Sequence, residues 1–407
     1  MKMQVHREVP YLNDQRLDPC SFLTRMSLMT APVLLGLCVV VLVTLSICEV
    51  YSTTIAASGS RYMRMQCTWV AIGTAVCFAG ACLPLRRVVG WSRIWIILVA
   101  IPLLYLAVAQ TAVSIQRSWI SFFPGAAEIK GAVRWLKLGF VQLQPSEFGK
   151  IAIVIFLAAY YGRCSRKEIR SFVKGFLIPG TVASAVLGLM ILGKDLSTTV
   201  ISAAMVMSVM FIAGARKRYL LGAFLLLLSI GVVFVLNSPS RLSRITAFCD
   251  QDSSYQLQRS KMCLGVGGLT GTGYANGFMK SYLPEAHTDF IVAVIGEEFG
   301  WLGVIGVIVC YLSICGSIVL ISYSCRRQSE RLLCIGIALL IGFQAMINIG
   351  VVSGMCPTTG LTAPFLSYGG SSMVSMMFMV GLIFNVAVCN CYAMVAELEE
   401  RSRIPDI

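Results

Sequence analysis

Residues 282–300 read YLPEAHTDFIVAVIGEEFG, and the apolar run that begins inside this stretch continues to Tyr323. The ionisable residues of the stretch are Glu285, His287, Asp289, Glu297 and Glu298. An ionisable side chain within a membrane costs roughly 2.5–3.5 kcal/mol on insertion scales, so residues of this kind mark a functional site by default. We therefore predict one spanning helix that starts near Phe290, with a reactive site at its N-terminal end.

The composition indicates a membrane protein. The 407 residues are 57% hydrophobic and only 13% charged, whereas soluble domains carry about 25% charged residues. The net charge of +14 comes from Lys and Arg in short loops between apolar stretches, not on one face of a fold. We therefore expect contacts with membrane lipids and no binding of nucleic acid.

Ten stretches are apolar and long enough to cross roughly 30 Å of hydrocarbon. They are Leu28–Cys48, Cys67–Leu85, Ile94–Ile115, Glu147–Tyr161, Phe176–Leu192, Asp195–Ala213, Tyr219–Leu236, Phe290–Tyr323, Leu332–Ser353 and Ser371–Tyr392. We predict an all-α polytopic membrane protein with a single ten-helix membrane domain at residues 28–392. An N-terminal tail at 1–27 and a C-terminal tail at 393–407 flank it.

Lys and Arg are concentrated in four short loops, as expected for the cytoplasmic side of a membrane. These residues are Arg86, Arg87 and Arg93; Arg163, Arg166, Lys167, Arg170 and Lys174; Arg216, Lys217 and Arg218; and Arg326, Arg327 and Arg331. Both termini are then cytoplasmic. Three longer segments face outward: 116–146, the large loop 237–288 between the seventh and eighth helices, and 354–370. Cys249 and Cys263 share the large loop and either form a disulfide or stay free.

Two motifs close the first outer segment, GAVRWLKLG at 131–139 and QPSEFGK at 144–150. Arg134 beside Trp135 suits an anionic headgroup, because a guanidinium forks onto phosphate and an indole anchors at the interface. Glu147 and Lys150 are three residues apart on one helix face. They either neutralise each other, or Lys150 joins Arg134 in binding the headgroup.

Two further outer motifs each have a structural and a functional interpretation. Asp195 either caps the sixth helix while Lys194 extends into solvent, or both residues contribute to the site. The glycine-rich run 264–277 resembles a phosphate-binding loop, but it has no preceding strand and no following GKS or GKT. A backbone that bends tightly is the simpler interpretation of these glycines.

The last outer loop, 354–372, is rich in Pro, Gly and hydroxyl side chains and carries no charge. Irregular backbone at membrane depth is tolerated only where it is buried in protein or lines a cavity. We therefore expect this loop, with Ser367 and Ser371, to re-enter the membrane domain and to wall a cavity beside Asp289.

These motifs together resemble the SEDS family (shape, elongation, division and sporulation), which includes FtsW, RodA and SpoVE. The segments GAVRWLKLG, QPSEFGK, YLPEAHTDFIVAVIGEEFG and PTTGLTAPFLSYGGSS follow one another in the family's order across nearly the whole chain. The IGEE and PTTGLT segments look more like the FtsW branch, which favours a role in cell division over side-wall growth. The chain departs from the family where KDLST replaces a PDLGT turn, and it matches the family poorly between residues 237 and 257.

The resemblance implies a peptidoglycan glycosyltransferase that polymerises lipid II on the outer face of the cytoplasmic membrane. It also implies a class B penicillin-binding protein as partner, beside other division or elongation proteins. The family's essential acid matches Asp289, which we expect to act as general base. Pyrophosphate is a good leaving group, so no general acid is needed, in contrast to glycosidases.

Other charged residues are expected to support this base. Glu285 and His287 would orient Asp289. One of Glu297 and Glu298 would face the same cavity or pair with Lys150, and we choose Glu297. The cations of the outer motifs would stabilise the pyrophosphate; a divalent cation, Mg²⁺ or Mn²⁺, is the alternative.

Two other functions fit parts of the sequence. A lipid II flippase would also need polar groups between helices, but the inner halves of the spans are almost purely apolar and the charged motifs gather at the outer face. A non-catalytic scaffold for a penicillin-binding protein would not require an acid at Asp289. Substituting that residue separates the scaffold from the enzyme.

Overall fold

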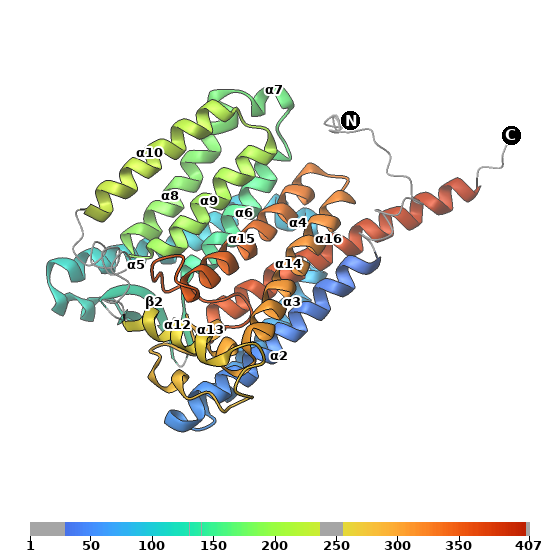
Figure 1. Ribbon diagram of the computed structural model, residues 1–407. Coiled ribbons are helices and arrows are strands. Elements are labelled where there is room, and N and C mark those ends of the chain that lie inside the picture. Colours follow the sequence, from blue (N-terminus) through green and yellow to red (C-terminus); the bar gives the residue numbers. More distant parts are fainter. Residues whose placement is uncertain (1–28, 130, 140, 237–254, 404–407) are drawn as a thin grey trace.

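The computed structural model describes residues 29–129, 131–139, 141–236 and 255–403. These residues form a bundle of long helices (Figure 1). The long helices are α2 (Ala31–Ser58), α3 (Arg61–Cys82), α5 (Ser92–Ile115), α6 (Pro145–Tyr161), α8 (Ile178–Leu192), α9 (Leu196–Ala213), α10 (Lys217–Leu236), α14 (Gly300–Tyr323), α15 (Gln328–Val352) and α16 (Gly370–Arg403). The shorter helical elements are α4 (Leu85–Gly90), η2 (Arg117–Phe122), α7 (Arg166–Ile169), η3 (Val173–Leu177), α12 (Tyr255–Gly267), η4 (Met279–Tyr282) and α13 (Ile291–Glu298).

Eight of the described helices are long and apolar enough to cross a membrane. The chain is therefore a polytopic, predominantly helical membrane protein, as predicted, but the count of ten spans is not established by these helices. The predicted fourth span corresponds to α6, which has only 17 residues and so reaches about 26 Å. The predicted seventh corresponds to α10.

The predicted eighth span is not one helix, so that prediction was wrong. It divides into α13 and α14 at Phe299 and Gly300, where Gly300 has a φ of 66°. A Cβ at Gly300 would lie 2.5 Å from both the amide nitrogen of Gly271 and the carbonyl oxygen of Leu269. The backbone of the glycine-rich segment therefore packs directly against the junction between α13 and α14. The close approach of Gly267 and Gly271 to the backbone of α13 leaves no room for a Cβ at these two positions.

A small sheet is present where the all-α prediction expected none. Its strands are β1 (Ala126–Ile129), β2 (Ala132–Leu138) and β3 (Val141–Leu143), in the antiparallel order β1-β2-β3. Val133 of β2 is fully buried against α5, and its backbone N–H donates to Gln110 Oε1 at 2.7 Å. The GAVRWLKLG motif therefore lies on an anchored strand, which fixes the position of Arg134.

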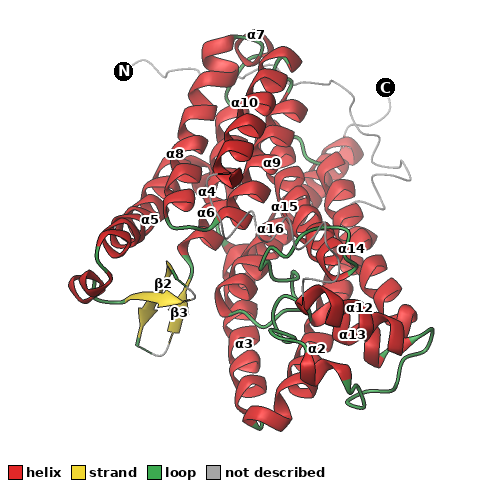
Figure 2. Ribbon diagram, turned by 60° about the vertical axis from the view of Figure 1, so that its left-hand side comes forward, coloured by secondary structure: helices red, strands yellow, loops and turns green. Residues whose placement is uncertain are grey.

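The polar segments gather at one end of the bundle. The sheet, α12 and α13 lie at this end, and α7 lies at the opposite end (Figures 1 and 2). Helix α6 is surrounded by other helices, since 15 of its 17 residues are buried. Its first turn, with the QPSEFGK motif, therefore starts inside the protein. Cys249 and the tail 1–27 lie outside the described residues, while the predicted tail from residue 393 continues α16 as far as Arg403.

Candidate active site

Asp289 lies where α13, α15 and the uncharged loop 354–369 meet. Asn348 of α15 donates to the carbonyl oxygen of Asp289 at 2.9 Å and to that of Leu361 at 2.8 Å. A Cβ at Gly360 would lie 3.6 Å from Asp289 Oδ2, so the loop runs directly beside the carboxylate. The half-buried carboxylate is therefore held against the loop that was expected to lie next to it.

His287 belongs to a cluster of three aromatic rings. Its ring centroid lies 5.2 Å from that of Tyr62 and 5.7 Å from that of Tyr368. The backbone N–H of Tyr368 donates to the His287 carbonyl oxygen at 2.9 Å. These contacts tie the HTDF segment to α3 and to the end of the loop 354–369.

Ser367 and Glu285 fix the turns around the same segment. Ser367 Oγ donates to the Thr288 carbonyl oxygen and accepts from the Ala363 N–H at 2.7 Å. Glu285 has a φ of 58°, and the Thr288 hydroxyl lies 3.1 Å from both its backbone and its carboxylate oxygens. Both residues therefore shape the backbone that carries Asp289.

Arg134 and Asp195 form a second polar group at this end of the bundle. Arg134 Nη1 lies 3.8 Å from Asp195 Oδ1, and Asp195 Oδ2 accepts hydrogen bonds from Gln144 at 2.7 Å and Ser146 at 2.5 Å. Asp195 precedes α9, but its side chain makes no capping hydrogen bond. The capping interpretation of Asp195 is thus incorrect, and its carboxylate instead holds Arg134 and the start of α6.

Arg134 is partly exposed and is not fully hydrogen-bonded. Its side chain is 32% exposed, whereas its Nε is buried and has no hydrogen-bond partner among the described residues. The half-buried Trp135 follows it on β2. Lys194, with a φ of 60°, donates to the Gly131 carbonyl oxygen at 3.2 Å. Arg134 therefore contacts Asp195, and the neighbouring Lys194 contacts Gly131, which precedes β2.

Lys150 is not presented to solvent. It is 1% exposed, its Nζ lies 2.9 Å from Glu147 Oε2, and it donates to Gln344 Oε1 at 2.9 Å. Glu147 Oε2 also accepts from Ser375 of α16 at 3.2 Å. This geometry favours the interpretation in which Glu147 and Lys150 neutralise each other. The pair joins α6 to α15 and α16.

Ser371 connects the sheet to α16. Its hydroxyl accepts from the Gln144 N–H at 3.0 Å and lies 3.2 Å from the Gln142 carbonyl oxygen. Ser197 of α9 donates to the Thr359 carbonyl oxygen at 2.5 Å. The QPSEFGK, KDLST and PTTGLT segments are therefore bound to one another directly, and Gly360 brings them to Asp289.

Glu297 and Glu298 bind a different segment from the one that we predicted. Glu297 accepts from the backbone N–H groups of Met279 and Lys280 at 2.6 and 2.8 Å. Glu298 forms an ion pair with Lys280 and accepts from the Ala275 N–H at 2.8 Å. Neither glutamate pairs with Lys150, whose carboxylate partner is Glu147, so that expectation was wrong. The two glutamates hold residues 275–280 onto α13.

Sequence reasoning missed Gln344 and Asn348, which bind the Lys150 side chain and the Asp289 backbone. Both are polar residues inside an apolar span and lie four residues apart, on one helix face. That spacing was the available signal. Among the residues that the structure describes, no group of three or more His, Cys, Asp or Glu side chains could hold a metal ion. We therefore derive no step through a protein-bound divalent cation.

Comparisons with known proteins agree with this arrangement of motifs. A family model described as "Cell cycle protein", for FtsW, RodA and SpoVE, matches residues 25–391. A protein of Trichlorobacter lovleyi named "Probable peptidoglycan glycosyltransferase FtsW" is 36% identical over 364 residues, which is 86% of this chain and 91% of that protein. A protein of Thiomicrospira cyclica with the same name is 34% identical over 378 residues, which is 86% of this chain and 90% of that protein.

Solved structures show the same fold. A chain from "Structural coordination of polymerization and crosslinking by a peptidoglycan synthase complex" is similar with a TM-score of 0.71 and 26% identity, covering 88% of this chain and 97% of that one. The rod shape determining protein RodA of Thermus thermophilus is similar with a TM-score of 0.64 and 26% identity, covering 87% of this chain and 95% of RodA. Sequence and fold agree along nearly the whole length, and the chain belongs to the FtsW/RodA/SpoVE family, the SEDS proteins.

Proposed function

We propose that this chain is a peptidoglycan glycosyltransferase that polymerises lipid II at the outer face of the cytoplasmic membrane. The proposal rests on one observation above all. The family's motif segments, distant in the sequence, are bound to one another, and the last of them lies beside the half-buried carboxylate of Asp289. Relatives that match this chain over most of their length are named peptidoglycan glycosyltransferases.

Asp289 has the chemistry that the reaction requires. An acceptor sugar hydroxyl attacks the anomeric carbon of the donor, the new glycosidic C–O bond forms, and the bond to the polyprenyl pyrophosphate breaks. Asp289 takes the hydroxyl proton as general base, which contributes about 10²- to 10⁴-fold in rate. The pyrophosphate leaves as a stabilised anion, so no general acid has to protonate it.

The cations beside the sheet suit the developing charge. Arg134 is held by Asp195, and its side chain is 32% exposed. A preorganised cation of this kind stabilises charge as it grows. Lys194 adds a second cation. The buried Lys150 maintains the packing of α6, α15 and α16 instead of contacting the substrate.

Replacing Asp289 by Asn tests the proposal, because the amide keeps the shape and cannot accept the proton. Proteoliposomes that contain the chain, its partner synthase and labelled lipid II should show a loss of glycan polymer of about 10²- to 10⁴-fold. Glu168→Gln, at a half-exposed carboxylate on α7 at the other end of the bundle, is the control and should keep full activity. Undiminished polymer in the Asn variant would refute the role of Asp289 as general base and favour a non-catalytic scaffold. Transfer of lipid II across the bilayer without polymer would favour a flippase.

We further propose a class B penicillin-binding protein as partner and a role in cell division. One structurally similar chain comes from a peptidoglycan synthase complex, and the matched relatives carry the name FtsW. Co-purification with each class B penicillin-binding protein of the same cell tests the pairing. Placement of a fluorescent fusion at the septum tests the role, and uniform placement along the side wall would contradict it.

We also propose that α6 and α10 complete ten crossings, with both termini in the cytoplasm. The four basic loops then fall on one side and the sheet with Asp289 on the other. Single cysteines at Gln116 and Arg170, introduced into a cysteine-free chain, test this topology. A membrane-impermeant maleimide added to intact spheroplasts should label the first position and not the second; the reverse pattern would overturn the orientation.

A further inference from the structure

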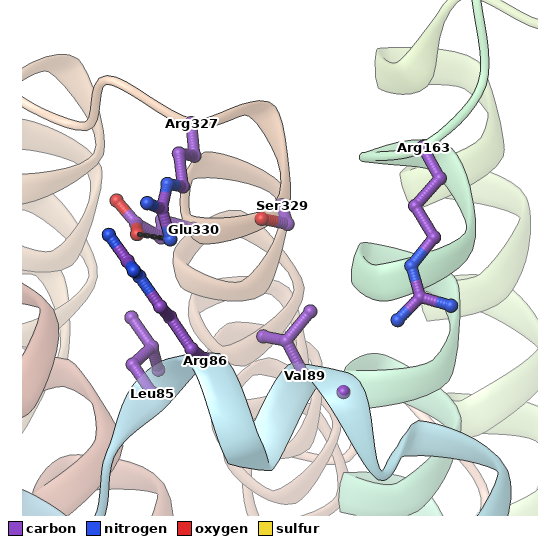
Figure 3. Close-up of a pocket in the computed structure, with 8 residues that line it drawn as sticks. Leu85, Arg86, Val89, Arg163, Arg327, Ser329 and Glu330 are labelled. Carbon is purple, nitrogen blue, oxygen red and sulfur yellow. Dashed lines mark ion pairs between the residues drawn. The ribbon is translucent and has the colours of Figure 1, made fainter. Parts of the chain in front are cut away.

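A cavity of about 140 Å³ lies at the end of the bundle that carries α7, away from Asp289. It is formed by α4, by the end of α6 and by the first turn of α15 (Figure 3). The side chains that line it and carry the argument are Leu85, Arg86, Val89, Arg163, Arg327 and Glu330. None of them takes part in the proposed glycosyl transfer.

Positive charge exceeds negative charge in this cavity. Three arginines from three separate elements face one carboxylate, Glu330, whose only ion pair in the described chain is with Arg327 at 3.9 Å. Neither Arg86 nor Arg163 forms an ion pair with another described residue. Figure 3 shows Arg163 on the far side of the opening from Arg327 and Glu330. The lining therefore carries three guanidinium groups against one carboxylate, which leaves an excess of positive charge for an external anion.

The floor of the cavity is apolar, and its surroundings are typical of a membrane interface. Leu85 and Val88 of α4 are buried, whereas Arg86 and Arg87 are exposed. This short helix is amphipathic, and its apolar side packs into the core of the bundle. Trp91, at the end of α4, is 55% exposed, as is usual for a tryptophan at the membrane surface.

We propose that this cavity binds the phosphate group of an anionic phospholipid. Guanidinium groups from separate elements suit a phosphate, because each offers paired N–H donors to its oxygens. The apolar floor favours a lipid over free phosphate as the source. A bound headgroup would join α4, α6 and α15. Two of these, α6 and α15, carry Lys150 and Gln344 toward their other ends, so the lipid would tie the helices that support the active site.

Lipid binding to the purified full-length chain in detergent tests the proposal. The probes are short-chain phosphatidylglycerol, short-chain phosphatidylcholine and inorganic phosphate, each titrated separately. Each basic side chain near an anionic lipid contributes about fivefold in affinity. Replacing the three cavity arginines by Ala should therefore weaken phosphatidylglycerol binding about 100-fold. Arg163→Ala alone should weaken it about fivefold and leaves no carboxylate unpaired, so its fold is not at risk.

The matched control removes the same charge outside the cavity, at Arg87, Arg166 and Arg218, which are exposed on α4, α7 and α10. The control should bind phosphatidylglycerol as the unchanged chain does. Equal loss in the control and cavity variants would overturn the proposal, because it would show diffuse attraction. If inorganic phosphate binds as tightly as phosphatidylglycerol, the ligand need not be a lipid and the proposal fails. If phosphatidylcholine binds as tightly as phosphatidylglycerol, the cavity does not select anionic headgroups and the proposal also fails.

Discussion

Replacing Lys150 by Met should lower the free energy of unfolding by about 3–5 kcal/mol, the usual cost of leaving one member of a buried ion pair unpaired. Lys150 is 1% exposed and Glu147 is 5% exposed, and Lys150 Nζ lies 2.9 Å from Glu147 Oε2. At this distance, with an effective dielectric constant of about 20, the attraction is about 6 kcal/mol. Desolvation offsets part of it. After the substitution, Ser375 is the remaining described donor to the Glu147 carboxylate.

A double-mutant cycle separates the pair from the rest of the core. Glu147→Gln together with Lys150→Met should recover most of the loss, because neither side chain then carries a buried charge. Denaturant unfolding in detergent measures all four proteins, and lipid II affinity is measured on those that remain folded. The reasoning is refuted if Lys150→Met costs less than about 1 kcal/mol while lipid II affinity falls, since Lys150 would then bind substrate.

Three further predictions concern single contacts. Gly300→Ala should destabilise the chain by at least about 1–3 kcal/mol, because φ is 66° there and a Cβ would collide with the docked glycine-rich segment. The control is Gly306→Ala, at a position with open space around it. Its free energy of unfolding should stay within about 1 kcal/mol of that of the parent chain in the same assay. Asn348→Leu should lower kcat in the glycan assay by about tenfold with little change in KM, because Asp289 loses its backbone tether; a change in KM alone would contradict this. Burial and a nearby carboxylate raise the pKa of the Cys263 thiol to about 12, so maleimide at pH 8 under reducing conditions should label it only after unfolding.

The class of protein and the family could be predicted from the sequence, because hydropathy and basic loops follow from the membrane itself and the motif segments are contiguous. The break at Gly300 could not. The apolar run from Phe290 to Tyr323 is compatible with one continuous helix. The helix divides where residues 267–273, which lie outside the run, pack closely against Gly300 and the end of α13. The sheet was missed for a related reason. Val133 and Trp135 favour a strand, but the partners that complete the sheet lie in other parts of the same loop.

The sequence left two arrangements open for the charged residues whose partners are local, and it did not indicate the partners that are distant in the sequence. Glu147 and Lys150 are three residues apart on a helix, so one of the two predicted arrangements had to be their ion pair. One of Glu297 and Glu298, for which we chose Glu297, was expected to face the cavity of Asp289 or to pair with Lys150. Their partners instead come from the segment 275–280, which precedes the motif and folds back onto α13.

Asp289 owes its placement to a distant helix more than to its own motif. One amide, that of Asn348, donates to carbonyl oxygens on two loops, at Asp289 and at Leu361. Because the two N–H groups of an amide diverge at a fixed angle, they set the separation of the two loops. That separation brings the carboxylate beside Gly360, where the loop has no side chain to cover it. A glutamine at position 348 would add one methylene and displace both carbonyls together, so it should not replace asparagine even though it offers the same donors.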